Sequence, residues 1–427
     1  VVNHVFDKSD AKGSSLQLAS LLFPDHDHVH QHGADLDVKA LSQGTTNGLF
    51  KVSYRMPDSP VDAAALVKVY GDGTEVTIDR NKELKVHALL SENQLSSSPL
   101  VRFANGHAYQ FITGAVCSVR DMAKPRIYRG VARELARWHA TLPSAHFQDP
   151  QQSLEFEPSI WSTARRWLDA ISSYPGGSPA DKERLREQFQ YLANRLLLNG
   201  YVPDPLVLGH GDLLSGNIII QASPSPAAGG TAASTDVASV RFIDYEHATF
   251  CPRAFELANH FAEWAGFDCD YSLLPTTSTR RDFVREYLRA LSDINRQQQN
   301  DNDDDTSTSS SGADDVPRSA DLPPVTEAEV DRLMDQVDAY RGFPGFYCPD
   351  GGWVAGYFLA LGLTRLLRGR GLCALIQAET STGTIDFDYA AYAEKRFAEY
   401  RAWRMVDGGS DAANEDMPLR EKRWASP

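Results

Sequence analysis

The feature that most constrains this chain is a set of three short apolar runs around polar loops. They cover 206–208, 218–220 and 240–243, and the last run ends on Asp244. Apolar runs this short, rich in β-branched residues and bounded by glycine, proline or polar residues, are typical of buried strands. The sequence therefore predicts that the polar loop 209–217 connects two strands and that a carboxylate follows the third.

Within the polar loop, Asp212 precedes Asn217 by five positions, after His210. In the catalytic loop of kinases an Asp base and a metal-binding Asn have this spacing. Phosphoryl transfer needs a residue that orients the attacking hydroxyl and ligands for Mg²⁺, so Asp212 fits the base, and Asn217 and Asp244 fit the metal ligands. The alternative is an ordinary turn capped by polar side chains, which the flanking strands and Asp244 disfavour.

The N-terminal part places three further polar residues in a kinase-like order. Residues 38–52 are typical of a strand, a glycine-rich turn and a strand, and the turn contains Asn47. Backbone N–H groups in such a turn approach phosphate oxygens closely. The next strand carries Lys68 and the helical run after it carries Glu83. In kinases a strand lysine contacts the phosphates and pairs with a helix glutamate. Taken singly, the turn could belong to a plain hairpin, and Lys68 and Glu83 could be ordinary surface residues. The inference of an ATP site therefore depends on the order of these elements along the chain.

An apolar run at 109–114 ends on a glycine and is predicted to be the strand where a small N-terminal lobe meets a larger C-terminal lobe. We expect its backbone, around Gln110 and Ile112, to contact an adenine ring. Apolar residues then recur at helical spacing. The predicted helices cover 127–139, 160–171, 179–198 and 325–341.

A helix predicted over 255–266 carries Glu256, His260 and Glu263 along one side, next to Trp264. This stripe has two interpretations. An acidic stripe beside a tryptophan can hold an ammonium group by charge and by the aromatic face. The same stripe is also typical of the solvent-facing side of an amphipathic helix.

Composition excludes several classes of function. The net charge of −15 and the pI of about 5.2 disfavour nucleic acid and anionic membranes as partners, and they favour a small cationic substrate. Five scattered cysteines without a close pair argue against a disulfide framework or a zinc cluster and fit a reducing compartment. No apolar run reaches 18 residues and no signal pattern is present, so we predict a cytoplasmic protein without an integral membrane segment.

Three polar segments are expected to contribute little to the site. Residues 1–38 are predicted to be irregular, and the alternating histidines at 26, 28, 30 and 32 are interpreted as a solvated lead-in rather than a metal site. Residues 223–238 are expected to form an extended loop. Residues 297–321 are rich in Gln, Asn, Asp, Ser and Thr and are predicted to be a disordered insertion.

From about Leu41 to Arg401, the chain resembles the choline/ethanolamine kinase family, relatives of protein kinases and aminoglycoside phosphotransferases. Four motifs carry the resemblance: Gly-His-Gly-Asp-Leu-Leu-Ser-Gly-Asn-Ile-Ile at 209–219, Phe-Ile-Asp-Tyr-Glu at 242–246, Asn-His-Phe-Ala-Glu-Trp at 259–264 and Thr-Ile-Asp-Phe-Asp-Tyr at 384–389. Within the family, the residues at 44–47, 213–214 and 265–275 look most like the ethanolamine kinase branch.

The resemblance implies a two-lobed, protein-kinase-like α+β fold, with a small antiparallel-sheet lobe and a larger, mostly helical lobe. The expected divisions are an irregular segment at 1–38, an ATP-binding lobe at 39–113, a catalytic and substrate lobe at 114–405 and a tail at 406–427. The implied cofactors are ATP and Mg²⁺.

The resemblance also implies roles for individual residues. Asp212 would be the base, and Asn217 and Asp244 would bind magnesium. The amine would lie near Glu263, Tyr271 and Trp264, and ATP would lie near Asn47, Lys68, Glu83, Gln110 and Ile112. The implied activity is phosphorylation of ethanolamine, the first step of the CDP-ethanolamine route to phosphatidylethanolamine. The implied partner is a small amino alcohol, and a homodimer is an open expectation.

Two alternatives follow from the departures. Family members usually have two tryptophans walling the amine pocket where Arg370 and Cys373 stand here. A choline kinase or a dual-specificity enzyme is therefore the first alternative. The second is a pseudokinase that binds nucleotide or a partner, which the intact Asp212, Asn217 and Asp244 argue against.

Overall fold

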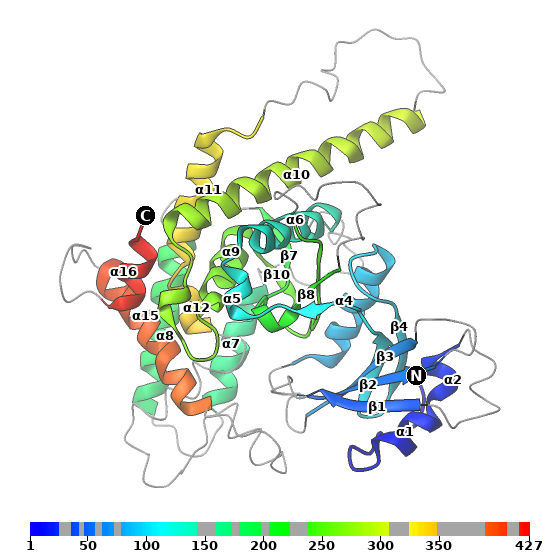
Figure 1. Ribbon diagram of the computed structural model, residues 1–427. Coiled ribbons are helices and arrows are strands. Elements are labelled where there is room, and N and C mark those ends of the chain that lie inside the picture. Colours follow the sequence, from blue (N-terminus) through cyan, green and yellow to red (C-terminus); the bar gives the residue numbers. More distant parts are fainter. Residues whose placement is uncertain are drawn as a thin grey trace.

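The computed structural model has two lobes (Figure 1), a small one built on an antiparallel sheet and a larger, mostly helical one, which confirms the predicted fold class. It describes residues 1–24, 36–41, 47–55, 62–71, 78–142, 159–172, 179–197, 205–222, 237–306, 324–347, 389–407 and 418–427. Within these ranges, none of the helices has both the length and the apolar composition needed to span a bilayer.

The small lobe is a sheet with strand order β1-β2-β3-β5-β4, and all neighbouring strands are antiparallel. Its strands are β1 (Leu36–Leu41), β2 (Gly48–Tyr54), β3 (Ala63–Val69), β4 (Pro99–Phe103) and β5 (Gly106–Gln110). One helix, α4 (Arg80–Glu92), starts after Asp79, whose side chain accepts hydrogen bonds from the first-turn N–H groups. The strand predicted at 109–114 corresponds to β5, which begins at Gly106 and ends at Gln110.

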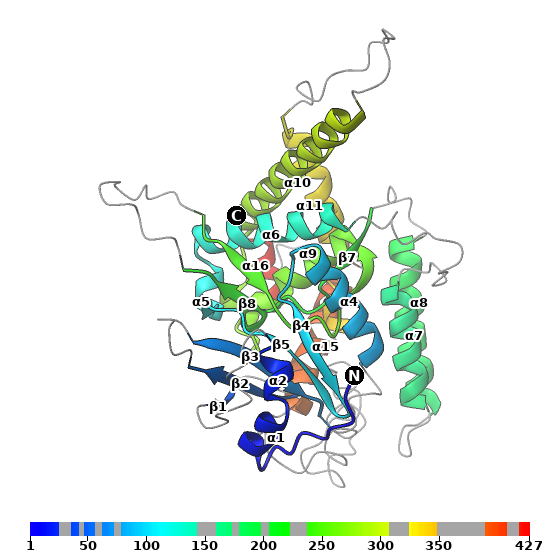
Figure 2. The same ribbon diagram turned by 90° about the vertical axis from the view of Figure 1, so that its right-hand side faces the viewer.

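The N-terminal segment corrects the prediction of an irregular lead-in. It contains α1 (Ala11–Gln17) and α2 (Ala19–Leu22), which lie against the sheet (Figure 2). Its apolar residues Phe6, Leu18 and Phe23 are buried in one cluster with the sheet face that points away from the larger lobe, which includes Phe50 and Val67. Its apolar residues are concentrated at 16–23, a local signal that the prediction of an irregular segment did not use.

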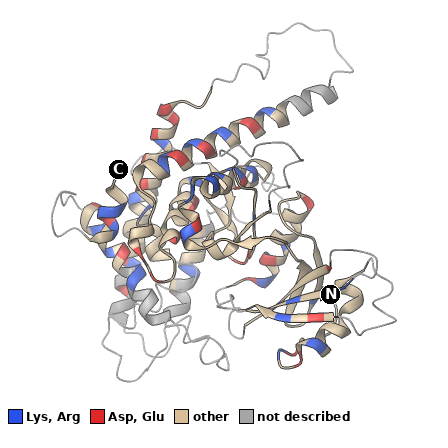
Figure 3. Cartoon of the chain, in the orientation of Figure 1, with Lys and Arg blue, Asp and Glu red and all other residues tan. Residues whose placement is uncertain are grey.

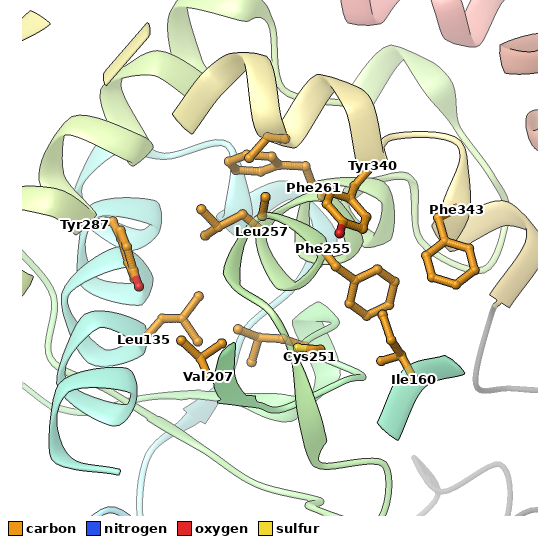
Figure 4. Packing of buried hydrophobic residues seen from close by; sticks show 14 of the residues in the cluster. Leu135, Ile160, Val207, Cys251, Phe255, Leu257, Phe261, Tyr287, Tyr340 and Phe343 are labelled. Carbon is orange, nitrogen blue, oxygen red and sulfur yellow. The ribbon is translucent and has the colours of Figure 1, made fainter. Parts of the chain in front are cut away.

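The larger lobe is a set of helices around one core. The helices are α5 (Val119–Met122), α6 (Pro125–Thr141), α7 (Ser159–Ser172), α8 (Pro179–Leu197), α9 (Arg253–Ala262), α10 (Thr277–Thr306), α11 (Glu327–Tyr340), α12 (Phe343–Tyr347), α15 (Tyr389–Asp407) and α16 (Leu419–Ala425). Figure 4 shows how side chains from α6, α7, α9, α10, α11 and β7 meet in the core, with Phe255 and Leu257 fully buried. The four predicted helices at 127–139, 160–171, 179–198 and 325–341 are confirmed within a few residues.

Short strands hold the polar loop as the sequence predicts. β7 (Leu206–Gly209) pairs with β10 (Thr249–Pro252), and β8 (Ile218–Ile220) lies between β6 (Ala115–Val116) and β9 (Val240–Phe242). The loop thus leaves one small sheet and enters another through the 3-10 turn η3 (Ser215–Asn217). Asp244 follows β9, directly beside the strand that Asn217 precedes.

Two expectations about the C-terminal part are corrected. Helix α10 continues to Thr306, so 297–306 is helical. Between Arg280 and Arg296 the charges along α10 are of both signs (Figure 3). The supposed tail at 406–427 contains the end of α15 and the docked helix α16. The histidines at 26–32, residues 223–236 and 307–321, the motif at 384–388, and Arg370 and Cys373 lie outside the described residues.

Candidate active site

A cavity of about 650 Å³ lies where the two lobes meet. Both lobes line it, and the lining residues with polar side chains are Asn47, Lys68, Tyr109, Asp212, Ser215, Asn217, Asp244 and Glu246. Ile112, on the segment that connects the lobes, lines it as well. The structure therefore brings together, on one cavity, residues that are up to about 200 positions apart in the sequence.

Asp212 and Asn217 are connected directly. The Asn217 side-chain amide donates to the Asp212 carboxylate at 3.1 Å and to the Asp212 backbone carbonyl at 2.8 Å. His210 supports the same loop, since its Nδ1 accepts from the Asp212 N–H and its Nε2 donates to the Ile243 carbonyl at 2.9 Å. These bonds require a neutral His210, and burial lowers its pKa to about 4.

Side chains of helix α9 hold the backbone of the loop 209–217 by hydrogen bonds. Glu256 accepts hydrogen bonds from the N–H groups of His210 and Gly211, and Asn259 donates to the Gly211 carbonyl. His260 Nδ1 donates to the Leu213 carbonyl at 2.8 Å. Glu256 and His260 are at most 1% exposed, so the interpretation of this stripe as a solvent-facing side is wrong.

The backbone conformation at position 211 and the space around it both require a glycine. Its φ is +78°, and a Cβ there would lie 2.5 Å from the His247 carbonyl oxygen. Most side chains are strained in this region of φ and would also clash here.

Lys68 is the centre of a buried charge cluster. Its ammonium lies 2.7 Å from carboxylate oxygens of Glu83, Asp244 and Glu246, and its side chain is 2% exposed. Burial opposes the charge of Lys68, but the three carboxylates outweigh burial and hold its pKa well above the usual value. Arg80 adds a second cation, which lies 2.9 Å from Glu83 and 2.8 Å from Glu246.

Asp244 combines an unusual backbone with a perturbed charge. Its φ is +66°, which is uncommon for a residue other than glycine and frequent at functional sites. Desolvation and the nearby Glu246 carboxylate raise the pKa of Asp244 to about 6, against the effect of Lys68. Ligand oxygens of Glu83, Asp244 and Glu246 lie within 4.8 Å of one another, and the cation that they surround is the Lys68 ammonium.

Five predicted residues do not line this cavity. Glu83 is 3% exposed and pairs with Lys68, which does line it. Gln110 is exposed at the end of β5. Glu263, in the 3-10 turn η4 (Glu263–Ala265), is buried and pairs with Arg396, and Tyr271 is half-buried in the turn η5 (Tyr271–Leu273).

Trp264 lies in the core of the larger lobe. It is 2% exposed, its indole N–H donates to His260 Nε2, and its ring packs against Phe261 and Tyr128. These contacts give Trp264 a structural role, and they lend no support to a contact with an amine.

Sequence reasoning missed the roles of Arg80, Glu246 and Glu256. Arg80 and Glu246 connect to the side chain of Asn47, since Arg80 donates to Asn47 Oδ1 and Asn47 Nδ2 donates to Glu246 at 3.0 Å. The motif at 242–246 contains a second carboxylate, Glu246, two positions after Asp244, and this acidic residue within the motif is the signal that points to it.

Replacing Glu256 by Gln should change how stability depends on pH. Burial raises the pKa of Glu256 to about 7, above the 4.5 expected in the unfolded chain. Its contribution to stability is therefore complete below pH 4.5 and is lost as the pH rises through 7. The neutral Gln escapes this loss, so relative to the wild type it should gain up to about 3 kcal/mol between pH 4.5 and pH 8. Urea unfolding at both pH values measures this gain, and an equal difference at the two pH values would contradict it.

Several known proteins are similar to this chain over most of its length. The family model described as choline/ethanolamine kinase matches residues 38–401. A probable ethanolamine kinase of Arabidopsis thaliana is 28% identical over 371 residues, which are 85% of this chain and 78% of that protein. A probable ethanolamine kinase A of Dictyostelium discoideum is 32% identical over 267 residues, which are 60% of this chain and 69% of that protein.

Solved structures agree in fold. Ethanolamine kinase from Plasmodium vivax matches with a TM-score of 0.62 and 22% identity, covering 94% of this chain and 93% of that chain. Choline kinase from Cryptosporidium parvum matches with a TM-score of 0.60 and 18% identity, covering 94% and 97%. The family model spans most of the sequence and covers Lys68, Asp212, Asn217 and Asp244. This chain therefore belongs to the choline/ethanolamine kinase family.

Proposed function

We propose that this protein transfers the γ-phosphoryl group of ATP to the hydroxyl of ethanolamine, as the first step of the CDP-ethanolamine route to phosphatidylethanolamine. The observation that carries the proposal is the convergence of Asp212, Asn217, Asp244 and Lys68 on one cavity between the lobes. The names of the relatives above support ethanolamine as the acceptor.

Asp212 is proposed to orient the substrate hydroxyl and to accept its proton. The residue sits in a loop whose backbone is held by Glu256, Asn259 and His260, so its carboxylate is fixed before substrate binds. The Asn217 amide holds one oxygen of that carboxylate. Fixed groups lose little freedom on the way to the transition state, which is how positioning lowers the barrier.

The oxygen donors at the cavity fit a magnesium ion. Asn217 and Asp244 are the proposed ligands, and Glu246 adds a carboxylate beside them. Magnesium prefers oxygen ligands and usually keeps only one or two protein carboxylates. When bound, Mg²⁺ would neutralise charge on the phosphate oxygens of ATP.

ATP is proposed to lie along the small lobe. Lys68 would contact phosphate oxygens while Glu83 holds its ammonium in place. Asn47, which donates to Glu246, would lie next to the phosphates of ATP. Ile112 lines the cavity where an adenine ring would lie. The backbone near Gln110 stays a proposed adenine contact.

Glu263 and Tyr271 remain the proposed amine contacts. A primary ammonium offers N–H donors to a carboxylate such as Glu263, whereas a quaternary ammonium depends on aromatic faces. This difference favours ethanolamine over choline. Localisation in the cytoplasm, assembly as a homodimer and the limits of the ATP-binding lobe at 39–113 stay predictions from the sequence.

Release of ADP with a graded series of acceptors tests the substrate. The series is ethanolamine, its mono- and dimethylated forms, and choline, each with ATP and Mg²⁺. We expect kcat/KM to fall along the series, by about tenfold or more from ethanolamine to choline. A constant or rising kcat/KM would favour choline kinase or a dual-specificity enzyme. ATP binding without turnover of any acceptor would favour the pseudokinase.

A further inference from the structure

Helix α16 lies beyond the residues that the family model matches, which end at 401. It packs against η5 and α15 in the larger lobe, and Figure 1 shows it beside α15. Arg420, Glu421 and Trp424 are each at most 3% exposed. A helix of polar sequence that buries charged side chains this deeply is held in place by specific partners.

A chain of buried ion pairs runs from α16 to Glu263. The Arg420 Nε lies 3.5 Å from Glu399 Oε2, which lies 3.3 Å from Arg396 Nη1. The other terminal nitrogen of Arg396 donates to Glu263 Oε1 at 2.9 Å. All four residues are at most 5% exposed, and the charges alternate along the chain. The two contacts of Glu399 Oε2 act through charge, and the contact between Arg396 and Glu263 is a hydrogen bond, so the four side chains are coupled electrostatically.

A second set of contacts connects α16 to the segment that carries Tyr271. Arg423 Nε donates to the Leu274 carbonyl at 3.0 Å, immediately after η5. The Thr277 N–H donates to the Ser426 carbonyl at 2.9 Å. The two routes from α16 thus end on Glu263 and on the turn of Tyr271.

We propose that α16 is a positioning element of the amine site. Through Arg420 and Arg423 it holds Glu263 and the turn of Tyr271 in place. The inference rests on the proposed function, which places these two residues near the amine. Groups that are already ordered bind a ligand at a smaller entropic cost. Lys68 and Asp244 are held by contacts of their own, so ATP binding is expected to be independent of α16.

Charge and positioning predict opposite results when Arg420 is lost. Removing a cation makes the surroundings of Glu263 more negative, which alone would strengthen the attraction for an ammonium and lower KM. Loss of positioning raises KM, because part of the binding free energy is then spent on ordering Glu263. The direction of the change in KM separates the two.

The test uses Arg420→Met and Arg423→Met in the full chain, with KM measured for ethanolamine and for ATP. We expect KM for ethanolamine to rise about tenfold in Arg420→Met and about threefold in Arg423→Met. KM for ATP should stay within about twofold in both. Arg420→Lys keeps the charge and should restore most of the affinity.

Arg285→Met is the matched control. Arg285 pairs with Glu327 between α10 and α11, in the same lobe, and has no part in the chain to Glu263. Its KM for ethanolamine should equal that of the wild type. In addition, Arg420→Met should have little further effect in a Glu399→Gln background, because Glu399 transmits the contact.

An unchanged or lower KM for ethanolamine in Arg420→Met and Arg423→Met would overturn the inference. If Arg420→Met does not fold, as thermal melting would show, Arg423→Met decides in the same way. A wild type that does not phosphorylate ethanolamine would overturn the proposed function instead, so the two failures are distinguishable.

Discussion

An Asp212→Asn variant is expected to lose about 10³-fold in kcat while binding ATP as tightly as the wild type. Asn has the same shape as Asp but cannot accept the proton of the substrate hydroxyl at neutral pH. The loop itself should stay in place, because its backbone is held by hydrogen bonds to Glu256, Asn259 and His260. None of these three bonds involves the Asp212 side chain. ATP affinity from fluorescence titration and kcat from ADP release measure the two effects separately.

Ser215→Ala is the matched control for this variant. Ser215 lines the same cavity and has no role in the proposed mechanism. We expect its kcat to stay within about threefold of the wild type. Full activity of Asp212→Asn would exclude Asp212 as the base.

An Asp244→Asn variant should lose activity without losing stability. Loss of a charged magnesium ligand is expected to lower kcat by about 10³-fold, since metal neutralisation of phosphate charge supplies several kcal/mol. The pKa of Asp244 is raised to about 6, so its charged form is unfavourable in the metal-free folded state above that pH. Above pH 6, in a chelator, the neutral Asn should therefore melt at the same temperature as the wild type or higher.

Asp37→Asn serves as the control for the same chemical change. Asp37 is on β1, its side chain is 60% exposed and it pairs with Lys39, away from the cavity. Both its kcat and its melting temperature should match the wild type. A lower melting temperature for Asp244→Asn would mean that the Lys68–Asp244 ion pair stabilises the metal-free fold more than the crowding of carboxylates destabilises it.

The central residues were predictable because their signals are local. Asp212 and Asn217 are five positions apart in one loop, and Asp244 directly follows an apolar strand. Strand and loop boundaries of this kind follow from apolar runs and turn residues, which act over a few positions. The same reasoning located Lys68 on its strand and Glu83 on its helix.

The supporting residues were not predictable in the same way because they act across long distances in the sequence. Glu256 bonds a loop 46 positions earlier, and Lys68 meets Glu246 across 178 positions. Helix α16 is short and polar, and its buried side became visible only with its partners in place. Trp264 shows the converse, since a tryptophan beside an acidic residue suggested a ligand contact and is part of the core.

The measurement that tests the account most directly is ³¹P NMR of the wild type with ATP, Mg²⁺ and ethanolamine. The account predicts one phosphoethanolamine for each ATP consumed, none when ethanolamine is omitted, and formation about 10³-fold slower when Asp212→Asn replaces the wild type. Inorganic phosphate in place of phosphoethanolamine, or unchanged ATP with a folded protein that binds it, would contradict the account.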